Sequence, residues 1–219
     1  MRFIVRVALT AALAAGAAGG IGAGAAAAAG PPASAFVPAG FEVERRVSAD
    51  IGGDRRADAV LVLRRVAPAG APADEPPALA RRLVLLKARA DGGFVQIGEG
   101  RRVLLCTRCG GAFFGAATTP VRVRVRAKVV IVEQERGSRQ LTRQRFRIRA
   151  EGALGTRLIG VDVRVADRLT GAVVERSTNL LTGERLVTRT DARGRRSVTR
   201  SRVPVRRIPL ERVVQGAWR

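Results

Sequence analysis

Histidine and tyrosine are both absent from this sequence of 219 residues, and aromatic residues make up only 4% of it. The absence of histidine removes the commonest general base, the His-based catalytic triads and the usual zinc hydrolase sites. No P-loop or dinucleotide-binding fingerprint is present, and Ser138, Ser177, Ser197 and Ser201 lack the context of a nucleophile elbow. These absences predict a protein that is not an enzyme.

Lysines and acidic residues are scarce beside arginine. Lys87 and Lys128 are the two lysines, and lysine plus arginine total 40 against 18 acidic residues, which gives a formal net charge of +22. A positive field of this size attracts polyanions, with a strength that depends on salt. The composition therefore predicts contact with anionic partners.

Charged side chains are also missing for 35 residues after Arg6, where alanine and glycine dominate. A positive start, a weakly apolar run and a small-x-small site form the pattern of a secretory signal peptide. Cleavage is expected near Ala29 or Ala35, which leaves a signal peptide over 1–35 and one domain over 36–219. The alternative is an uncleaved membrane anchor, but alanine and glycine partition weakly into hydrocarbon. We expect an exported protein, periplasmic or secreted, with no transmembrane anchor after processing.

Only two cysteines are present, and they form the C-x-x-C segment Cys106–Cys109. A zinc ribbon would need a second pair or histidines. A thioredoxin-type redox site would place the first cysteine at the start of a helix, whereas Gly-Gly-Ala-Phe-Phe-Gly follows here. In an oxidising compartment the segment predicts a disulfide between Cys106 and Cys109. Its stabilisation should be modest because so short a loop removes little chain entropy.

No stretch after residue 35 shows the 3.6-residue apolar periodicity of a helix, and short segments of alternating apolar and polar residues occur instead. Val121–Arg126 alternates valine and arginine, which is typical of a strand with one apolar and one polar face. The same alternation marks 144–149 and 161–165, and we expect the first segment to run on through 128–132. The side chains of Arg122, Arg124 and Arg126 should then project from one face as an anion-binding surface, or as a merely solvated face.

Turn signals separate these segments. Asp91-Gly92-Gly93 lies between two apolar stretches and predicts a hairpin. Leu169-Thr-Gly171 recurs as Leu181-Thr-Gly183, twelve residues later, and this is the spacing of one strand plus one turn. We predict an all-β fold of a single domain, mainly antiparallel, as a meander, a sandwich or a barrel-like sheet, with a core of valine, leucine, isoleucine and alanine.

The stretch Asp50–Asp58, DIGGDRRAD, places an aspartate at every fourth position, and an apolar strand follows it. A calcium loop needs several hard oxygens within a few residues and a glycine that lets the chain fold back. Asp50, Asp54 and Asp58 are therefore candidate metal ligands.

This stretch resembles the loop of FG-GAP and VCBS-type repeat proteins, D-x-N-G-D-G-x-x-D followed by a hydrophobic strand. Together with the leader and the C-x-x-C-G-G segment, it is similar to a group of exported bacterial proteins with that loop. Gly52 departs from the pattern where Asn or Asp would be a ligand, and Arg55 departs from it where Gly is usual. Because Arg55 and Arg56 also compete for the aspartates, the resemblance implies a degenerate loop that binds Ca²⁺ weakly or not at all. Repeat proteins stack several such loops as propeller blades, so a single loop does not predict a full propeller.

The sequence thus favours a non-catalytic envelope protein without a cofactor, which binds anionic envelope polymers or lipids through arginine-lined strands. One alternative is a glycan hydrolase that uses carboxylates or a bound metal. Another is a nucleic-acid binder, suggested by charge alone. Export argues against specific binding of nucleic acid, and the arginine strands interleave with valine rather than with aromatic residues.

Overall fold

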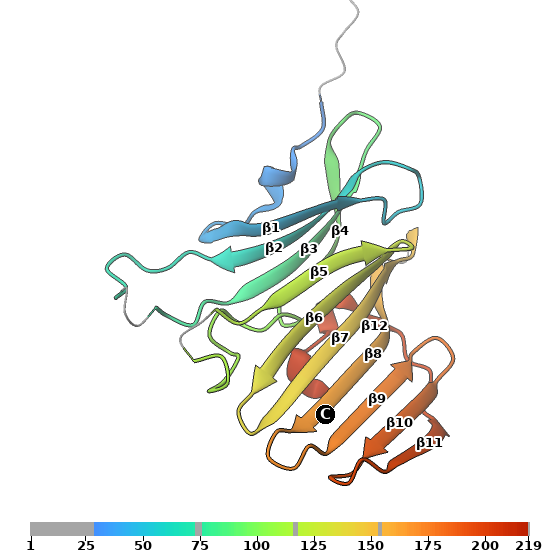
Figure 1. Ribbon diagram of the computed structural model, residues 1–219. Helices are drawn as coiled ribbons and strands as arrows, with labels where there is room; N and C mark the ends of the chain where they lie inside the picture. The colour runs from blue at the N-terminus through green and yellow to red at the C-terminus, as the bar shows by residue number, and fades with distance from the viewer. Residues whose placement is uncertain (1–28, 73–75, 116–117, 153–154, 219) are drawn as a thin grey trace, which may run out of the picture.

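The computed structural model describes residues 29–72, 76–115, 118–152 and 155–218, and the fold is all-β, as predicted (Figure 1). Two antiparallel sheets, one of four strands and one of eight, contain the described strands. These strands form neither a propeller nor a closed barrel. The predicted signal peptide falls mainly on residues 1–28, which lie outside the described part of the chain.

The small sheet has the order β1-β2-β3-β4 and is built from β1 (Phe41–Ala49), β2 (Asp58–Arg65), β3 (Arg81–Ala88) and β4 (Phe94–Gly100). The large sheet has the order β11-β10-β9-β8-β7-β6-β5, and its strands are β5 (Val121–Arg126), β6 (Val129–Gly137), β7 (Gln140–Ala150), β8 (Thr156–Asp167), β9 (Val173–Asn179), β10 (Glu184–Thr190) and β11 (Arg196–Arg202). A short β12 (Ile208–Pro209) pairs with the beginning of β8. The turns predicted at Asp91–Gly93, Leu169–Gly171 and Leu181–Gly183 all lie between consecutive antiparallel strands.

One expected strand is divided into two. The sequence suggested that Val121–Arg126 runs on through 128–132, but the chain reverses at Ala127 and Lys128, whose φ angles are 48° and 63°. Two consecutive residues with positive φ are the signature of a tight hairpin turn. The reversal has a packing reason, because the inward valines are odd-numbered before the turn and even-numbered after it. In the hairpin, Val125 pairs with Val130, and the odd-numbered valines of β5 and the even-numbered valines of β6 face the same core.

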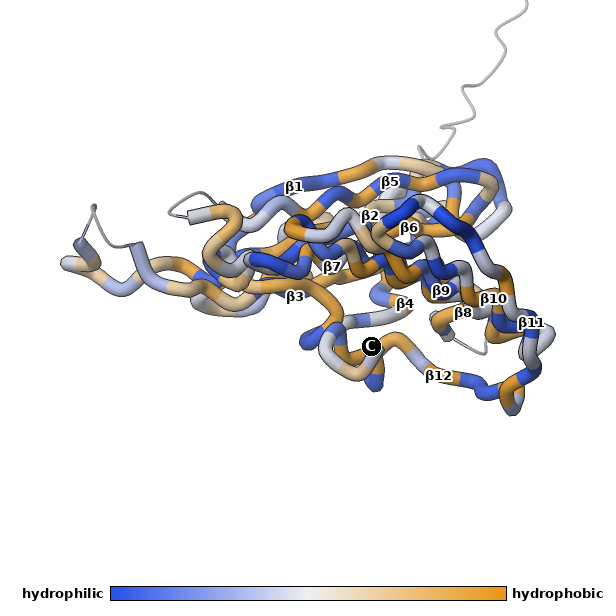
Figure 2. Tube along the Cα trace, turned by 60° about the horizontal axis from the view of Figure 1, so that its bottom comes forward, coloured by the Kyte–Doolittle hydropathy of each residue, from blue (hydrophilic) through white to orange (hydrophobic). Residues whose placement is uncertain are grey.

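The main core lies between the two sheets. It joins the side chains that point inward from β2 and β3 to those from β5–β8, and Phe146, Ile148 and Leu158 in it have no exposed surface. Figure 2 shows hydrophobic and hydrophilic residues alternating along the strands of the large sheet. This alternation places one face of each of these strands in the core and the other face outward.

Strands β2 and β3 are buried on both faces. Their second face carries Leu61, Leu63 and Leu86, which form a smaller core. The 3-10 helix η1 (Ala33–Phe36) covers this core with the buried side chain of Ala33. The segment before it is tied to β4, because the amide of Phe94 donates a 2.9 Å hydrogen bond to the carbonyl of Pro31.

The C-terminal segment returns across the inner face of the large sheet and contains two short 3-10 helices, η3 (Leu210–Arg212) and η4 (Gln215–Ala217). Leu210 is fully buried against Gly100 of β4. Gln144 of β7 donates to the carbonyls of Gln215 and Trp218, at 2.9 and 3.0 Å. Its cross-strand neighbour Gln134 holds another segment in the same way, since it binds the amide of Leu105 and the carbonyl of Val103. Among the described helices, none is long and apolar enough to cross a membrane.

Strands β9–β11 continue the large sheet beyond the part that the small sheet covers (Figure 1). All seven residues of β11 are exposed. The outer face of the large sheet therefore extends without interruption from β5 to this exposed edge.

Candidate anion-binding face and aspartate loop

The strand registers place most of the arginines of the large sheet on one face, opposite the core. Arg122, Glu133, Arg145 and Asp162 stand side by side on β5–β8 and show the alternation of charge across this face. Arginines clearly outnumber carboxylates on the same face of the described strands. The outward arginines are Arg122, Arg124, Arg126, Arg143, Arg145, Arg147, Arg149, Arg157, Arg164, Arg196, Arg200 and Arg202, and the outward carboxylates are Glu133, Glu135, Asp162, Glu175 and Glu184.

The three arginines that the sequence selected all lie on this face. Arg122, Arg124 and Arg126 are exposed on β5, while Val123 between them is buried. Arg124 is engaged with Glu133 through a 3.1 Å ion pair. For Arg122 and Arg126, no ion pair with a described residue occurs. The β5 arginines therefore form one border of the basic face rather than a site of their own.

Glu133 is the carboxylate that links β5 to β7. Its Oε1 accepts from Arg124 at 3.1 Å and from Arg145 at 2.6 Å. Partial burial opposes ionisation, but the hydrogen bonds and positive charges of Arg124 and Arg145 outweigh burial, so the pKa of Glu133 is lowered. Glu133 is therefore ionised at neutral pH and competes with any external anion for these two arginines.

Other carboxylates engage further arginines of the face. Asp162 accepts from Arg147 at 2.8 Å, and Arg143 is bonded to Glu135. Arg164 donates to Glu175 at 3.1 Å. These pairs are largely exposed, and exposed pairs contribute little to stability. Their main effect is to hold guanidinium groups in fixed positions on the sheet.

Three hollows cross the arginine face side by side. The first lies over β5–β7 with a volume of about 410 Å³, the second over β7–β11 with about 400 Å³, and the third over β9–β11 with about 520 Å³. Arg143 and Arg145 line both the first and the second, and Ser177 and Leu186 line both the second and the third. We call this row of adjoining hollows the arginine trough. Since neighbouring strands are about 4.8 Å apart, a trough across seven strands is roughly 29 Å long.

The aspartate loop precedes β2, and its three side chains converge as the sequence predicted. One carboxylate oxygen from each of Asp50, Asp54 and Asp58 lies within 4.8 Å of the others. Asp58 is fully buried, and its Oδ2 accepts the amides of Ile51 and Gly52, both at 2.8 Å. Its Oδ1 accepts the amide of Ala88, the last residue of β3, at 2.8 Å. Asp58 thus fastens the loop to the neighbouring strand.

The other two aspartates also bind the loop's own backbone. Asp50 accepts the amides of Gly53 and Arg55, at 2.5 and 3.1 Å. Asp54 accepts the amide and the guanidinium of Arg56, each at 3.1 Å. The backbone hydrogen bond from Arg56 is the main reason that the pKa of Asp54 is lowered. All six carboxylate oxygens of the loop therefore already accept hydrogen bonds within the protein.

Both lysines of the chain approach this loop, which sequence reasoning missed. Lys87 of β3 lies 3.4 Å from Asp54 Oδ2 through its Nζ. Lys128, from the β5–β6 turn, is so close to Gly53 that a Cβ there would lie 2.9 Å from its Nζ. Arg55 has a left-handed backbone, with φ of 64°, at the position where the FG-GAP loop pattern has glycine. The sequence offered one hint of these contacts, namely that only two of its 40 basic residues are lysines.

This donor set does not fit a strong calcium site. Calcium takes six to eight oxygens, and the three carboxylates here are shared with backbone amides, with Arg56 and with the ammonium of Lys87. A bound ion would have to displace positive charges that the fold supplies. The loop instead has a structural role in fixing the turn before β2.

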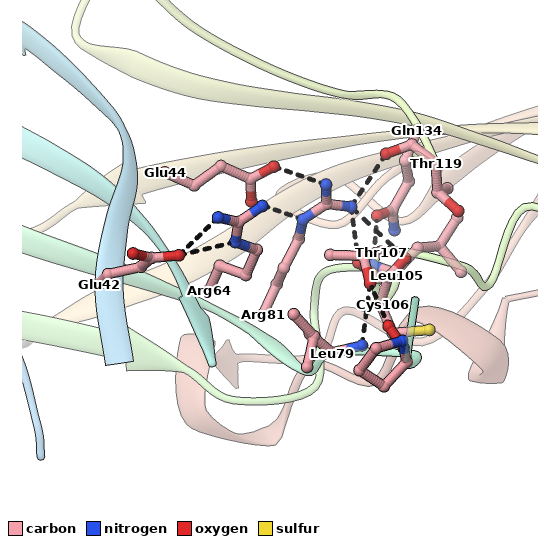
Figure 3. Close-up of polar contacts among 11 residues, drawn as sticks. Glu42, Glu44, Arg64, Leu79, Arg81, Leu105, Cys106, Thr107, Thr119 and Gln134 are labelled. Carbon is pink, nitrogen blue, oxygen red and sulfur yellow. Dashed lines mark hydrogen bonds and ion pairs between the residues drawn. The ribbon is translucent and has the colours of Figure 1, made fainter. Parts of the chain in front are cut away.

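The cysteines form the predicted disulfide, with Cα atoms 5.0 Å apart. Arg81 organises the surrounding loop from a buried position at the start of β3 (Figure 3). Its Nε and Nη2 each donate to the carboxylate of Glu44 at 2.6 Å. Its Nη1 donates to the carbonyls of Leu105, Cys106 and Thr119, at 3.3, 3.4 and 2.9 Å. The disulfide loop is thereby joined to β1 and β3.

Comparisons with known protein families, with curated proteins and with solved structures found no match for this chain. The likeness to FG-GAP and VCBS proteins is accordingly limited to an aspartate cluster in a loop.

Proposed function

We propose that this chain is an exported, non-catalytic protein of the cell envelope that binds linear anionic polymers or anionic lipids along the arginine trough. The observation that carries the proposal is that three arginine-lined hollows adjoin one another across the outer face of the large sheet. A guanidinium group binds phosphate or carboxylate through paired N–H donors, so a row of fixed arginines suits a chain of such groups.

The trough also explains the role of the intervening carboxylates. Four of them, Glu133, Glu135, Asp162 and Glu175, each neutralise an arginine in the absence of ligand and yield it to a stronger anion. Binding then exchanges internal ion pairs for external ones, which makes the affinity modest and strongly dependent on salt.

Titration of the protein with inorganic polyphosphate tests this proposal, and tripolyphosphate serves as the short competitor. The long polymer should bind much more tightly per molecule, because it spans the trough, and its affinity should fall steeply between 0.05 and 0.3 M salt. Equal affinity for both polymers, or affinity independent of salt, would overturn the proposal.

The variant Glu133→Gln gives a second test, in which binding increases. It releases Arg124 and Arg145, so the affinity for polyphosphate should rise several-fold. Glu211→Gln changes the net charge equally at an exposed position outside the trough and serves as the control. An equal rise in both variants would show that only the net charge matters.

A further inference from the structure

The disulfide loop has an accessible sulfur-bearing residue beside an open hollow. Cys109 is exposed, whereas Cys106 is half-buried. A hollow of about 710 Å³ lies against Cys109 and is lined by Gly110, Gly111 and the β6–β7 turn. An extended segment of a partner protein can therefore reach Cys109 without unfolding of the chain.

The loop keeps its shape through contacts that do not involve the disulfide. Arg81 holds the carbonyl of Cys106, as described above. The hydroxyl of Thr107 accepts the amide of Leu79 at 2.9 Å, and the amide of Thr107 donates to the carbonyl of Leu79 at 3.0 Å (Figure 3). Beyond Cys109, the amide of Gly137 donates to the carbonyl of Gly110 at 2.7 Å. The loop is thus held at both ends by contacts other than the disulfide.

Two arginines are neighbours of the cysteines, one in the chain and one along the hollow. Arg108 lies between them in the chain, and its Nη1 is buried with no hydrogen-bond partner among the described residues. Arg136 lines the same hollow as Cys109. A guanidinium that lies close to a reduced sulfur stabilises the thiolate and lowers the pKa of the thiol, so either arginine would favour exchange from such a position.

We propose, beyond the binding function above, that Cys106–Cys109 is an exchangeable disulfide, and that each oxidised copy oxidises one dithiol of a partner protein stoichiometrically. A partner thiolate attacks Sγ of Cys109, the Sγ–Sγ bond breaks, and its electron pair leaves on Sγ of Cys106. A second partner thiolate then attacks the partner's sulfur in the mixed disulfide and releases Cys109 as a thiolate. The partner's two thiols become a disulfide, the loop becomes a dithiol, and two protons pass from the partner to the loop through water.

The first experiment asks whether the disulfide opens within a folded protein. Reduction by dithiothreitol should expose two thiols while the circular dichroism spectrum of the sheets persists. The unfolding temperature should fall by no more than about 8 °C, because so short a loop removes little chain entropy from the unfolded state. Loss of the folded spectrum on reduction would show that the bond is structural and would overturn the proposal.

The second experiment measures the reactivity of Cys109 alone in Cys106→Ser. The pH profile of its alkylation by iodoacetamide should have a midpoint below the ordinary thiol value of about 8.5. Adding Arg108→Gln should move that midpoint upward, whereas Arg126→Gln should leave it unchanged, because Arg126 lies at the end of the β5–β6 hairpin away from Gly137 and the cysteine loop. A midpoint at or above the ordinary value, or equal shifts in both arginine variants, would contradict the proposal.

The third experiment uses a reduced peptide with two cysteines as the probe. Oxidised wild-type protein should convert one equivalent of the peptide to its disulfide. Cys106→Ser with Cys109 joined to glutathione should accumulate a mixed disulfide with a second peptide that has one cysteine, because that peptide has no second thiol to release Cys109. Failure of the wild-type protein to oxidise the peptide, although dithiothreitol opens the bond, would also contradict the proposal.

Discussion

Replacement of Arg81 by methionine is the most informative perturbation of the fold. The Arg81 side chain is 2% exposed and donates two hydrogen bonds to the Glu44 carboxylate and three to backbone carbonyls. Removal of one partner from a buried pair costs about 3–5 kcal/mol, because the other charge is left uncompensated. Glu44 retains 25% of its side-chain surface, so water compensates it in part. We therefore expect a loss of about 2–4 kcal/mol in the free energy of unfolding.

The matched control is Arg64→Met, on the neighbouring strand of the same sheet. Arg64 pairs with Glu42 at 2.5 Å, but both side chains are exposed, by 39% and 47%. Such a pair contributes less than about 1 kcal/mol. Urea denaturation monitored by circular dichroism should therefore separate the two variants clearly. Equal losses of stability in the two variants would refute the reasoning that burial makes Arg81 important.

Three other predictions concern the loop, the leader and acid stability. Calorimetric titration should give a calcium dissociation constant no better than roughly 10⁻⁴–10⁻³ M, tightened by Lys87→Gln, whereas micromolar affinity abolished by Asp54→Ala would show a working site. Intact-mass measurement of exported protein should show that the leader is cleaved after Ala29. Cleavage after Ala35 would remove the buried Ala33 and the Pro31 carbonyl that accepts the amide of Phe94. A mature chain that begins at residue 36 would contradict this prediction. Hydrogen bonds from Arg149 and Arg157 lower the pKa of Glu151, so the ionised carboxylate stabilises the fold fully above its unfolded pKa, near 4.5, and this stabilisation is lost as the pH falls through the folded pKa. Glu151→Gln should therefore flatten the loss of stability below about pH 4.5. An acid denaturation profile that is the same in the variant and the wild type would contradict this prediction.

The strands could be predicted from the sequence because one face of each is buried. Alternation along Val121–Arg126 and 144–149 reports that burial directly, and Gly171 and Gly183 mark the turns with positive φ of 75° each. The reversal at Ala127 was missed because the run of valines looks continuous. The change from odd to even inward positions was the available signal.

The candidate site could be predicted only in part. The convergence of Asp50, Asp54 and Asp58 follows from local spacing, and the disulfide follows from the C-x-x-C segment. The trough could not be predicted, because it depends on which strands become neighbours, and Arg145 meets Glu133 only through the register of β6 and β7. The contacts of Lys87 and Lys128 with the loop likewise need the tertiary fold, since the two residues come from different sheets.

The binding of long polyphosphate to two triple variants, measured by titration calorimetry at one salt concentration, tests the central claim most directly. Arg143, Arg145 and Arg164→Gln removes three charges from the trough, and Arg65, Arg193 and Arg212→Gln removes three exposed charges elsewhere. We predict that the first variant loses at least roughly tenfold in affinity, as expected when several phosphate contacts are removed, while the second loses only a few-fold. Equal losses in the two variants would contradict the account, because the binding would then depend on the net charge rather than on the arginine trough.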